Sequence, residues 1–239
     1  MDLPDITILI PSWNRRKFLP LLLRNIYVQD YPHDKIKVII DDDGQDKLFI
    51  PSELEEIKKE LSPIDFIYYN DKPKRSIGKK RNDLVKECKT KIFAFMDDDD
   101  IYLPTYLSHS YSTLKKNNVG CVGSDKMIFC MTDKEFGLYA INCGDNIEMI
   151  HEATIMATKK WFKGSCKFND GSTGEGRNLF VGQKNKVHIT DIEKVMVCVQ
   201  HSENTINKDH FQDDKFKIDM QIDSKMIELL KVVLNYENI

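Results

Sequence analysis

The sequence predicts an α/β fold in which a mainly parallel central sheet is covered by helices on both faces. In the first half of the chain, short apolar runs rich in β-branched residues alternate with amphipathic helical patterns, and each apolar run is followed by a polar segment. Apolar strands separated by helices are typical of parallel sheets that are buried on both faces. The 239 residues contain no repeat, low-complexity tract or linker. We therefore expect one domain over 1–239, an α/β/α sandwich with a Rossmann-like first half.

The elements of the first half follow from local signals. A capping box at Ser52–Glu55 predicts one helix start, Ser76 is a typical N-cap for another, and Pro104 suits the first turn of a third. The expected strands lie at 6–10, 37–40, 65–69 and 91–96, and the expected helices at 17–28, 52–61, 76–88 and 104–116.

The alternation weakens after residue 118. CVGSDKMIFCM (121–131) predicts one further strand, and the runs at 153–158 and 194–199 predict two more. The segment 163–176 is rich in Gly, Asn, Asp and Ser, which is typical of a loop. SKMIELLKVVLNY (224–236) predicts a C-terminal helix.

Composition narrows the function classes. A 41% hydrophobic and 31% charged chain is typical of a soluble globular protein, and a formal net charge of −3 argues against general nucleic-acid binding. The six cysteines form no CxxC pair, which favours reduced, buried thiols. The N-terminus resembles no signal peptide, and no segment is long enough to span a membrane, so we expect a soluble cytoplasmic protein.

Polar segments follow all four strands expected in the first half. They are PSWNRR, DDDGQD, NDKPKR and DDDD, in chain order. In open parallel sheets, ligands bind outside the carboxyl ends of the strands. We therefore expect these four segments to form a single site at one edge of the sheet.

The run Asp97–Asp100 needs a physical reason. Two unit charges about 4 Å apart repel by roughly 4 kcal/mol at an effective dielectric near 20. A divalent cation reverses the sign of that energy, and carboxylate oxygens suit Mg²⁺ or Mn²⁺. A solvated acidic turn is the alternative, but the buried strand before it favours a metal site.

A basic run, KPKRSIGKKR (72–81), ends at an expected helix start. Gly78 and the cations Lys79, Lys80 and Arg81 lie in the first helical turn, where anions bind favourably. An ordinary solvated basic face is the alternative. Opposite a metal at the same edge, however, the run predicts a cradle for a diphosphate.

Five segments of the first half together resemble those of the inverting glycosyltransferases of family 2. They are Pro11-Ser-Trp-Asn-Arg15, QDYP (29–32), VIIDDDG (38–44), IGKKRN (77–82) and FMDDDD (95–100). The family pattern is P-x-Y-N-R, V-D-D-G-S, G-x-x-x-x-R-N and D-x-D, in this order. The resemblance implies a GT-A fold, with a nucleotide-sugar-binding half at 1–118 and an acceptor-side half at 119–239.

The resemblance also implies residue roles. The nucleotide and donor sugar would contact Pro11, Trp13, Asn14, Arg15, Asp42, Gly78, Arg81, Asp97 and Asp98. Among these, Asp42 would hydrogen-bond the base, although Asp41 and Asp43 leave its alignment open by one residue. Asp99 would bind the metal.

The second half matches the family more loosely. Glu175 in GSTGEGRNLF aligns with the general base, although Gly176 stands where the family often has an aspartate; Asp170 is the reserve candidate. His201 in HSENT is a candidate metal ligand, with a structural histidine as the alternative. Trp161 would stack on an acceptor sugar or pack in the core.

The resulting hypothesis is a metal-dependent inverting glycosyltransferase. It would use Mn²⁺ or Mg²⁺ and move a sugar from a nucleotide donor, most simply a UDP-sugar, to a hydroxyl of a glycan or glycoprotein acceptor. One alternative is a sugar-phosphate nucleotidyltransferase, although PSWNRR lacks the glycines of its usual loop. The other is a non-catalytic nucleotide-sugar- or glycan-binding module.

Overall fold

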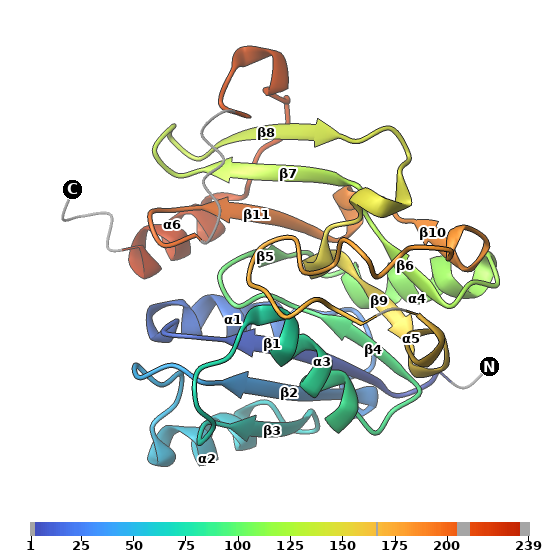
Figure 1. The fold of residues 1–239 in the computed structure, drawn as a ribbon. Coiled ribbons are helices and arrows are strands. Elements are labelled where there is room, and N and C mark those ends of the chain that lie inside the picture. Colours follow the sequence, from blue (N-terminus) through green and yellow to red (C-terminus); the bar gives the residue numbers. More distant parts are fainter. Residues whose placement is uncertain (1–2, 166, 205–210, 235–239) are drawn as a thin grey trace.

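The computed structural model describes residues 3–165, 167–204 and 211–234. A seven-stranded sheet in the order β10-β6-β9-β4-β1-β2-β3 forms its centre (Figure 1). The strands are β1 (Ile6–Ser12), β2 (Ile36–Asp42), β3 (Asp65–Tyr69), β4 (Ile92–Phe95), β6 (Cys121–Gly123), β9 (Met156–Thr158) and β10 (Val187–Ile189). The four strands predicted in the first half are all present.

The strand directions bring the expected polar segments together. β3, β2, β1 and β4 are neighbours and run parallel, while β9 runs antiparallel between β4 and β6. The carboxyl ends of the four parallel strands therefore meet at one edge of the sheet. This arrangement confirms the predicted α/β fold with a mainly parallel sheet.

Helices cover both faces of the sheet. On one face lie α1 (Leu19–Tyr27), α2 (Pro51–Glu60), α4 (Tyr106–Lys116) and α6 (Ser224–Val233), and on the other lie α3 (Ile77–Glu87) and α5 (Lys159–Gly164). Alternate side chains of β1 enter the two cores: Ile8 and Ile10 pack with the first group of helices, and Leu9 packs with the second. Both faces of the strand are buried, as its continuous apolar run predicts.

A second sheet lies beside the first and was not predicted. Its order is β5 (Ile101–Tyr102), β11 (Met196–Gln200), β7 (Lys126–Met131) and β8 (Gly137–Asn142). The single strand expected over 121–131 is wrong, because Ser124 and Asp125 separate β6 from β7. The backbone N–H of Ser124 donates to Thr154 Oγ1 (2.8 Å) and so leaves the ladder at that point.

Two predicted helix starts need correction. Ser52 is not a cap: α2 begins at Pro51, and the Glu53 carboxylate accepts from the backbone N–H of Ile50 (3.3 Å). Pro104 lies outside α4, whose N-cap is Thr105. The Ser76 cap is confirmed, since its hydroxyl accepts from the backbone N–H of Lys79 (3.2 Å). The predicted C-terminal helix is present as α6.

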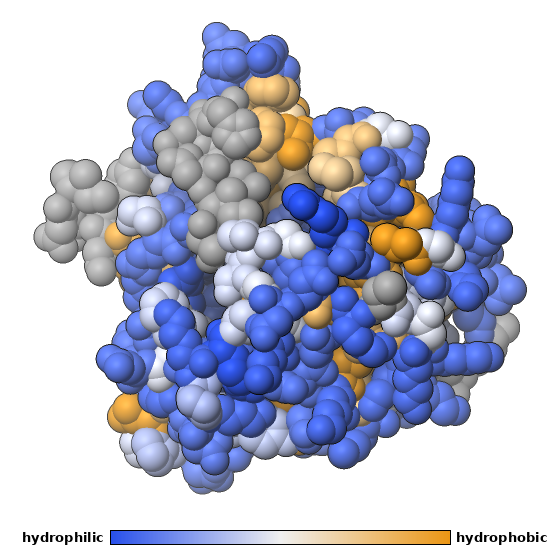
Figure 2. Space-filling model, viewed as in Figure 1, coloured by the Kyte–Doolittle hydropathy of each residue, from blue (hydrophilic) through white to orange (hydrophobic). Residues whose placement is uncertain are grey.

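The outer surface is mostly polar. Hydrophilic residues dominate the face shown in Figure 2, with apolar patches that are small and separated. Across the described parts of the chain, no helix combines the length and the apolar character that crossing a membrane requires.

Candidate active site

A pocket of about 270 Å³ lies at the carboxyl edge of the sheet, between the ends of β1 and β4 and the start of α3. It is lined by Pro11, Ser12, Trp13, Arg15, Lys74, Arg75, Ile77, Lys80, Arg81, Asp97, Asp98, Asp99 and Ser172. The structure thus brings together most of the predicted nucleotide-binding residues. Three of them, Asn14, Asp42 and Gly78, lie outside the lining.

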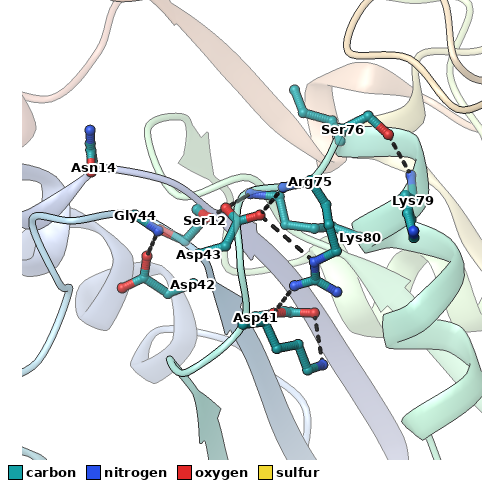
Figure 3. Close-up of polar contacts among 12 residues, drawn as sticks. Ser12, Asn14, Asp41, Asp42, Asp43, Gly44, Arg75, Ser76, Lys79 and Lys80 are labelled. Carbon is teal, nitrogen blue, oxygen red and sulfur yellow. Dashed lines mark hydrogen bonds and ion pairs between the residues drawn. The ribbon is translucent and has the colours of Figure 1, made fainter.

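Asp42 is fully buried, and its carboxylate accepts hydrogen bonds from three groups of the protein. Its Oδ1 accepts from the backbone N–H of Gly44 (2.9 Å), and its Oδ2 accepts from the backbone N–H of Leu48 (2.9 Å) and from the Tyr68 hydroxyl (2.6 Å). The carboxylate therefore holds the loop after β2 against β3. It points away from the basic cluster that its two neighbours contact (Figure 3).

Asp41 and Asp43 bind that basic cluster instead. The Arg75 guanidinium lies 2.6 Å from Asp41, and the backbone N–H of Arg75 donates to Asp43 (2.6 Å). The ammonium of Lys80, almost fully buried, donates to Asp43 (2.8 Å) and to the carbonyl of Ser12 (2.6 Å) (Figure 3). These pairs fix two cations of the pocket wall in position.

Asn14 joins the loop after β1 to the loop after β2. It has a positive φ of 54°, and its Oδ1 accepts from the backbone N–H groups of Gln45 (2.7 Å) and Asp46 (3.1 Å). A Cβ at Gly44 would overlap the backbone of Asn14, so only glycine permits this close approach. Asn14 therefore shapes the turn that presents its neighbours Trp13 and Arg15.

Trp13 offers an aromatic face at the mouth of the pocket. It is 40% exposed, and the ammonium of Lys74 lies 3.5 Å from the centre of its ring. A cation over an indole is a favourable contact. The ring is thus free of core packing and carries a positive charge beside it.

The backbone N–H groups at the start of α3 already have hydrogen-bond partners within the protein. The N–H of Ile77 donates to Ser172 Oγ (3.2 Å), that of Gly78 to the Gly171 carbonyl (2.9 Å), and that of Lys79 to Ser76. A Cβ at Gly78 would overlap the carbonyl of Asn169. Gly78 therefore allows the 168–176 loop to pack against α3, and the N–H groups of this helix start already have partners within the protein.

The four aspartates after β4 have different partners. Asp97 lies 3.2 Å from Arg81, and Asp100 accepts from the backbone N–H of Val199 in β11 (2.9 Å). Asp98 is 4% exposed, and its Oδ2 has no hydrogen-bond partner among the described residues. Burial, together with the neighbouring charge of Asp99, raises the pKa of Asp98 well above its ordinary value.

Asp99 lies between two groups that can carry charge. Its Oδ2 is 3.0 Å from Arg15 Nε and 3.3 Å from His201 Nε2. Burial alone would raise the pKa of Asp99, but the hydrogen bond to His201 and the charge of Arg15 outweigh it and lower the pKa. The structure therefore keeps Asp99 ionised beside Asp98.

Arg15 connects this acidic cluster to the segment after β11. Its Nη2 donates to the carbonyl of Glu203 (2.9 Å), and the Glu203 carboxylate also pairs with Lys17. The ring of His201 packs against Phe18 at a tilt of 39°, with ring centroids 4.7 Å apart. The part of the 201–204 segment nearest the pocket is thus held by the turn that precedes α1.

The contacts of His201 favour one tautomer of a neutral ring. Nδ1 accepts from the backbone N–H of Glu203 (3.2 Å), which leaves the ring proton on Nε2, and this atom faces Asp99 Oδ2 (3.3 Å) and the amide nitrogen of Asn204 (3.2 Å). A metal on Nε2 would require the other tautomer and release of the Glu203 N–H. His201 is therefore a hydrogen-bond donor to Asp99 in this conformation.

Glu175 is buried next to Arg81. The Glu175 and Arg81 side chains are 7% and 4% exposed, and Arg81 Nε lies 3.3 Å from Glu175 Oε1. Burial raises the pKa of Glu175 above its ordinary value; Arg81 lowers it in part, while Glu152 and Asp97 raise it further. Arg81 touches both Glu175 and Asp97, so one cation links the predicted base to the predicted donor site.

The remaining candidates occupy other surroundings. Asp170 is exposed and hydrogen-bonds the Ser76 hydroxyl at the α3 cap. Trp161 is 6% exposed and packs against Phe180 in the second core, which agrees with the core-packing alternative. It follows β9, whose Thr158 pairs with Ile92 at the amino end of β4, so it lies at the opposite edge of the sheet from Asp97.

Several site residues were not singled out from the sequence. Lys74 and Arg75 lie inside the basic run, and Glu203 lies inside HSENT. The sequence therefore marks the segments that contain them, but it does not show that they contact Trp13, Asp41 and Arg15. Ser172 lies inside GSTGEGRNLF, whereas Glu152 lies in none of the motifs. Their places depend on the 168–176 loop, which packs on α3 through pairs more than 80 residues apart, such as Asn82 with Phe168.

The family model of Glycosyl transferase family 2 matches residues 7–170, more than half of the chain. A processive diacylglycerol beta-glycosyltransferase of Mycoplasma genitalium is 31% identical over 97 residues, 41% of this chain and 28% of that protein. An uncharacterized glycosyltransferase of Rickettsia prowazekii is 27% identical over 142 residues, 58% of this chain and 41% of that one. The chain thus matches less than half the length of these relatives.

Solved structures share the fold. S. aureus TarS 1–349 matches with a TM-score of 0.61 and 15% identity, over 82% of this chain and 60% of that one. TarS has also been solved with UDP and with UDP-GlcNAc. The Pyrobaculum calidifontis mannosyltransferase PcManGT, in complex with GDP-Man and Mn²⁺, matches with a TM-score of 0.63 and 17% identity, over 84% and 57%. These likenesses confirm the predicted GT-A fold.

Proposed function

The chain belongs to glycosyl transferase family 2, and from this premise we propose that it moves a sugar from a nucleotide diphosphate donor to an acceptor hydroxyl, with inversion at the anomeric carbon. The acceptor class we propose is a glycan or glycoprotein. The observation that carries the proposal is one pocket lined by fixed cations and an acidic cluster, with Glu175 buried outside the lining and paired with the lining residue Arg81.

The charges in the pocket suit a diphosphate. Lys80 and Arg75 are held on the wall by Asp43 and Asp41, and Arg81 is held by Asp97. Cations that are already oriented lose little entropy when they bind phosphate oxygens, and they stabilise the charge that develops on a departing diphosphate. Since the N–H groups at the start of α3 are occupied, these side chains supply the binding.

The exposed ring of Trp13 supports stacking of a nucleobase at the pocket mouth. We propose uracil, as in the UDP complexes of TarS; the guanine of the GDP-Man complex of PcManGT is the competing choice. Asp42 is enclosed by its own partners, so we no longer place it against the base.

A divalent cation fits the acidic cluster. Asp98 Oδ2 is buried without a hydrogen-bond partner among the described residues, and the guanidinium of Arg15 already places positive charge against Asp99. No group of three metal-ligating side chains occurs in the described part of the chain. Mg²⁺ and Mn²⁺ commonly bind through one or two carboxylates plus phosphate oxygens and water. Asp99 would therefore hold the ion, with His201 as a second ligand after the tautomer change.

When bound, the ion would neutralise charge on the diphosphate as the glycosidic bond breaks. The protein's own part in the chemistry falls to Glu175. Its carboxylate would take the proton of the acceptor hydroxyl while that oxygen attacks the anomeric carbon, and the bonding pair would leave with the diphosphate. The raised pKa of Glu175 makes it a stronger base than an exposed glutamate, and Arg81 fixes its orientation.

A panel of donors tests this function. The purified protein is incubated with UDP-, GDP- and other nucleotide sugars, with glycan acceptors and Mn²⁺, and release of nucleoside diphosphate is measured. We expect release from one class of donor, and its loss in excess EDTA and in Asp99→Ala. Full activity in EDTA would contradict metal dependence. Pyrophosphate made from UTP and a sugar phosphate would instead support the nucleotidyltransferase alternative, and binding without turnover would support a non-catalytic module.

A further inference from the structure

A second glutamate lies directly against the peptide that follows Glu175. Glu152, in a single 3-10 turn (Glu152–Thr154), accepts through Oε1 from the backbone N–H of Gly176 (2.9 Å). A Cβ at position 176 would overlap this carboxylate group, so only glycine admits it. The two residues therefore form a close fit between segments 24 positions apart in the chain.

Glu152 is held by a rigid part of the fold. The backbone N–H of His151 donates to the Ser124 carbonyl at the end of β6 (2.9 Å), and Thr154 Oγ1 accepts from the Ser124 N–H (2.8 Å). On the other side, the N–H of Phe95 in β4 donates to the Ile155 carbonyl (2.9 Å). Hydrogen bonds at the ends of β6 and β4 thus hold the turn that contains Glu152. The Glu152 carboxylate in turn holds a loop that has no strand or helix of its own.

Glu152 also shares the electrostatic surroundings of Glu175. Three charged groups face Glu175: Arg81 from α3, Asp97 from the end of β4, and Glu152. Arg81 in turn feels the charges of Asp97, Glu175 and Glu152. Arg81 pairs directly with Asp97 and Glu175, and Glu152 adds a further negative charge to the same surroundings.

We propose that Glu152 is a positioning residue for Glu175, which it serves by holding the Gly176 peptide and by keeping negative charge beside the base. This inference rests on the proposed role of Glu175. It adds a second requirement to the site: the base functions only while Glu152 anchors its loop. Its two effects, a hydrogen bond and a charge, can be removed separately.

Three variants separate these effects. Glu152→Gln keeps an oxygen for the Gly176 N–H and removes the charge. Glu152→Ala removes both, and Gly176→Ala pushes the carboxylate away from the other side. Glu148→Gln, at an exposed acid in the preceding 3-10 turn, is the matched control. For each variant, donor affinity, kcat and the pH profile of kcat/KM are measured, and the Glu175 carboxyl is titrated by ¹³C NMR.

For Glu152→Gln we expect the Glu175 carboxyl to titrate at lower pH and the acid limb of kcat/KM to move the same way, with donor affinity unchanged. For Gly176→Ala and Glu152→Ala we expect kcat to fall roughly 10- to 100-fold, because small displacements of a catalytic group cost about that much. The double variant should lose no more than either single one, since both remove the same contact. Glu148→Gln should match the wild type.

Two results would overturn the inference: an unchanged Glu175 titration in Glu152→Gln, or wild-type kcat in Gly176→Ala. The NMR titration needs no turnover, so it tests the coupling even if the wild type transfers no sugar, a result that would overturn only the proposed function. If Glu152→Ala fails to fold, Glu152→Gln and Gly176→Ala still decide the question.

Discussion

Arg15 Nε lies 3.0 Å from Asp99 Oδ2, so the protein itself supplies a cation to its acidic cluster. The same guanidinium donates to the carbonyl of Glu203. Because the Arg15 side chain is only 12% exposed, water screens this pair weakly, and the contact is worth more than a surface ion pair. The run of aspartates that the sequence presents as a repulsive cluster is thus partly neutralised from within.

A metal ion at Asp99 must share that carboxylate with Arg15. Arg15→Gln should therefore tighten Mn²⁺ binding in the absence of nucleotide, by about 10-fold, since a competing unit charge at this distance is worth a few kcal/mol at most. Free Mn²⁺ measured by EPR gives the affinity. Arg16→Gln, which breaks a separate pair with Glu53, is the control and should leave Mn²⁺ binding unchanged. Equal affinities in both variants would refute competition at Asp99.

Asp42 and Trp13 should behave oppositely on substitution. Asp42→Ala leaves the N–H groups of Gly44 and Leu48 and the Tyr68 hydroxyl without their acceptor, so the free energy of unfolding should fall by about 3 kcal/mol or more. Trp13→Ala removes a partly exposed ring and its contact with Lys74, and should cost about 1 kcal/mol or less. Urea denaturation measures both.

Trp13→Ala also tests base recognition. UDP should raise the melting temperature of the wild type, because a ligand bound only to the folded state stabilises it by mass action. Trp13→Ala should reduce that shift. An equal shift with UDP and GDP would argue against a uracil pocket, and an undiminished shift in Trp13→Ala would remove Trp13 from it.

Much of this fold could be predicted because its first half follows local rules. The apolar runs at β1 to β4 and the Ser76 cap are local signals, and parallel pairing then brings their polar ends together without further information. The pairing of Asp42 with Tyr68, or of Gly176 with Glu152, depends on contacts distant in sequence. The family resemblance alone places Asp42 against the base. In the structure, its carboxylate points toward the loop at 44–48.

The sequence singles out Gly78 by its motif, but only the structure shows why glycine is needed at this position. Gly78→Ala should displace the 168–176 loop, because its Cβ would overlap the Asn169 carbonyl and approach Glu175 Cβ to 3.0 Å. We expect a loss of about 1–3 kcal/mol in the free energy of unfolding, together with reduced turnover. In Gly164→Ala the new Cβ meets no atom within 4 Å, so this control should retain both. A stable, active Gly78→Ala would show that the loop does not need this contact.

The raised pKa of Glu175 sets a direction for the pH profile. A general base must be ionised, so kcat/KM should fall as the pH drops through the pKa of Glu175 in the folded protein. Because burial raises that pKa, the acid limb should lie above the ordinary glutamate value of about 4.3. A profile of kcat/KM with saturating metal measures it. An acid limb at or below the ordinary value would argue that another group accepts the proton.

We propose that Glu175 performs the chemistry while the pocket beside it binds the donor. The most direct test is the rate of sugar transfer by Glu175→Gln at saturating donor, since this change keeps the shape of the side chain and removes its basicity. General-base catalysis typically contributes about 100- to 10,000-fold, so we expect transfer to fall at least 100-fold while donor affinity stays near that of the wild type. Transfer at a near-normal rate would show that Glu175 is not the general base, and Asp170 would then be the next candidate.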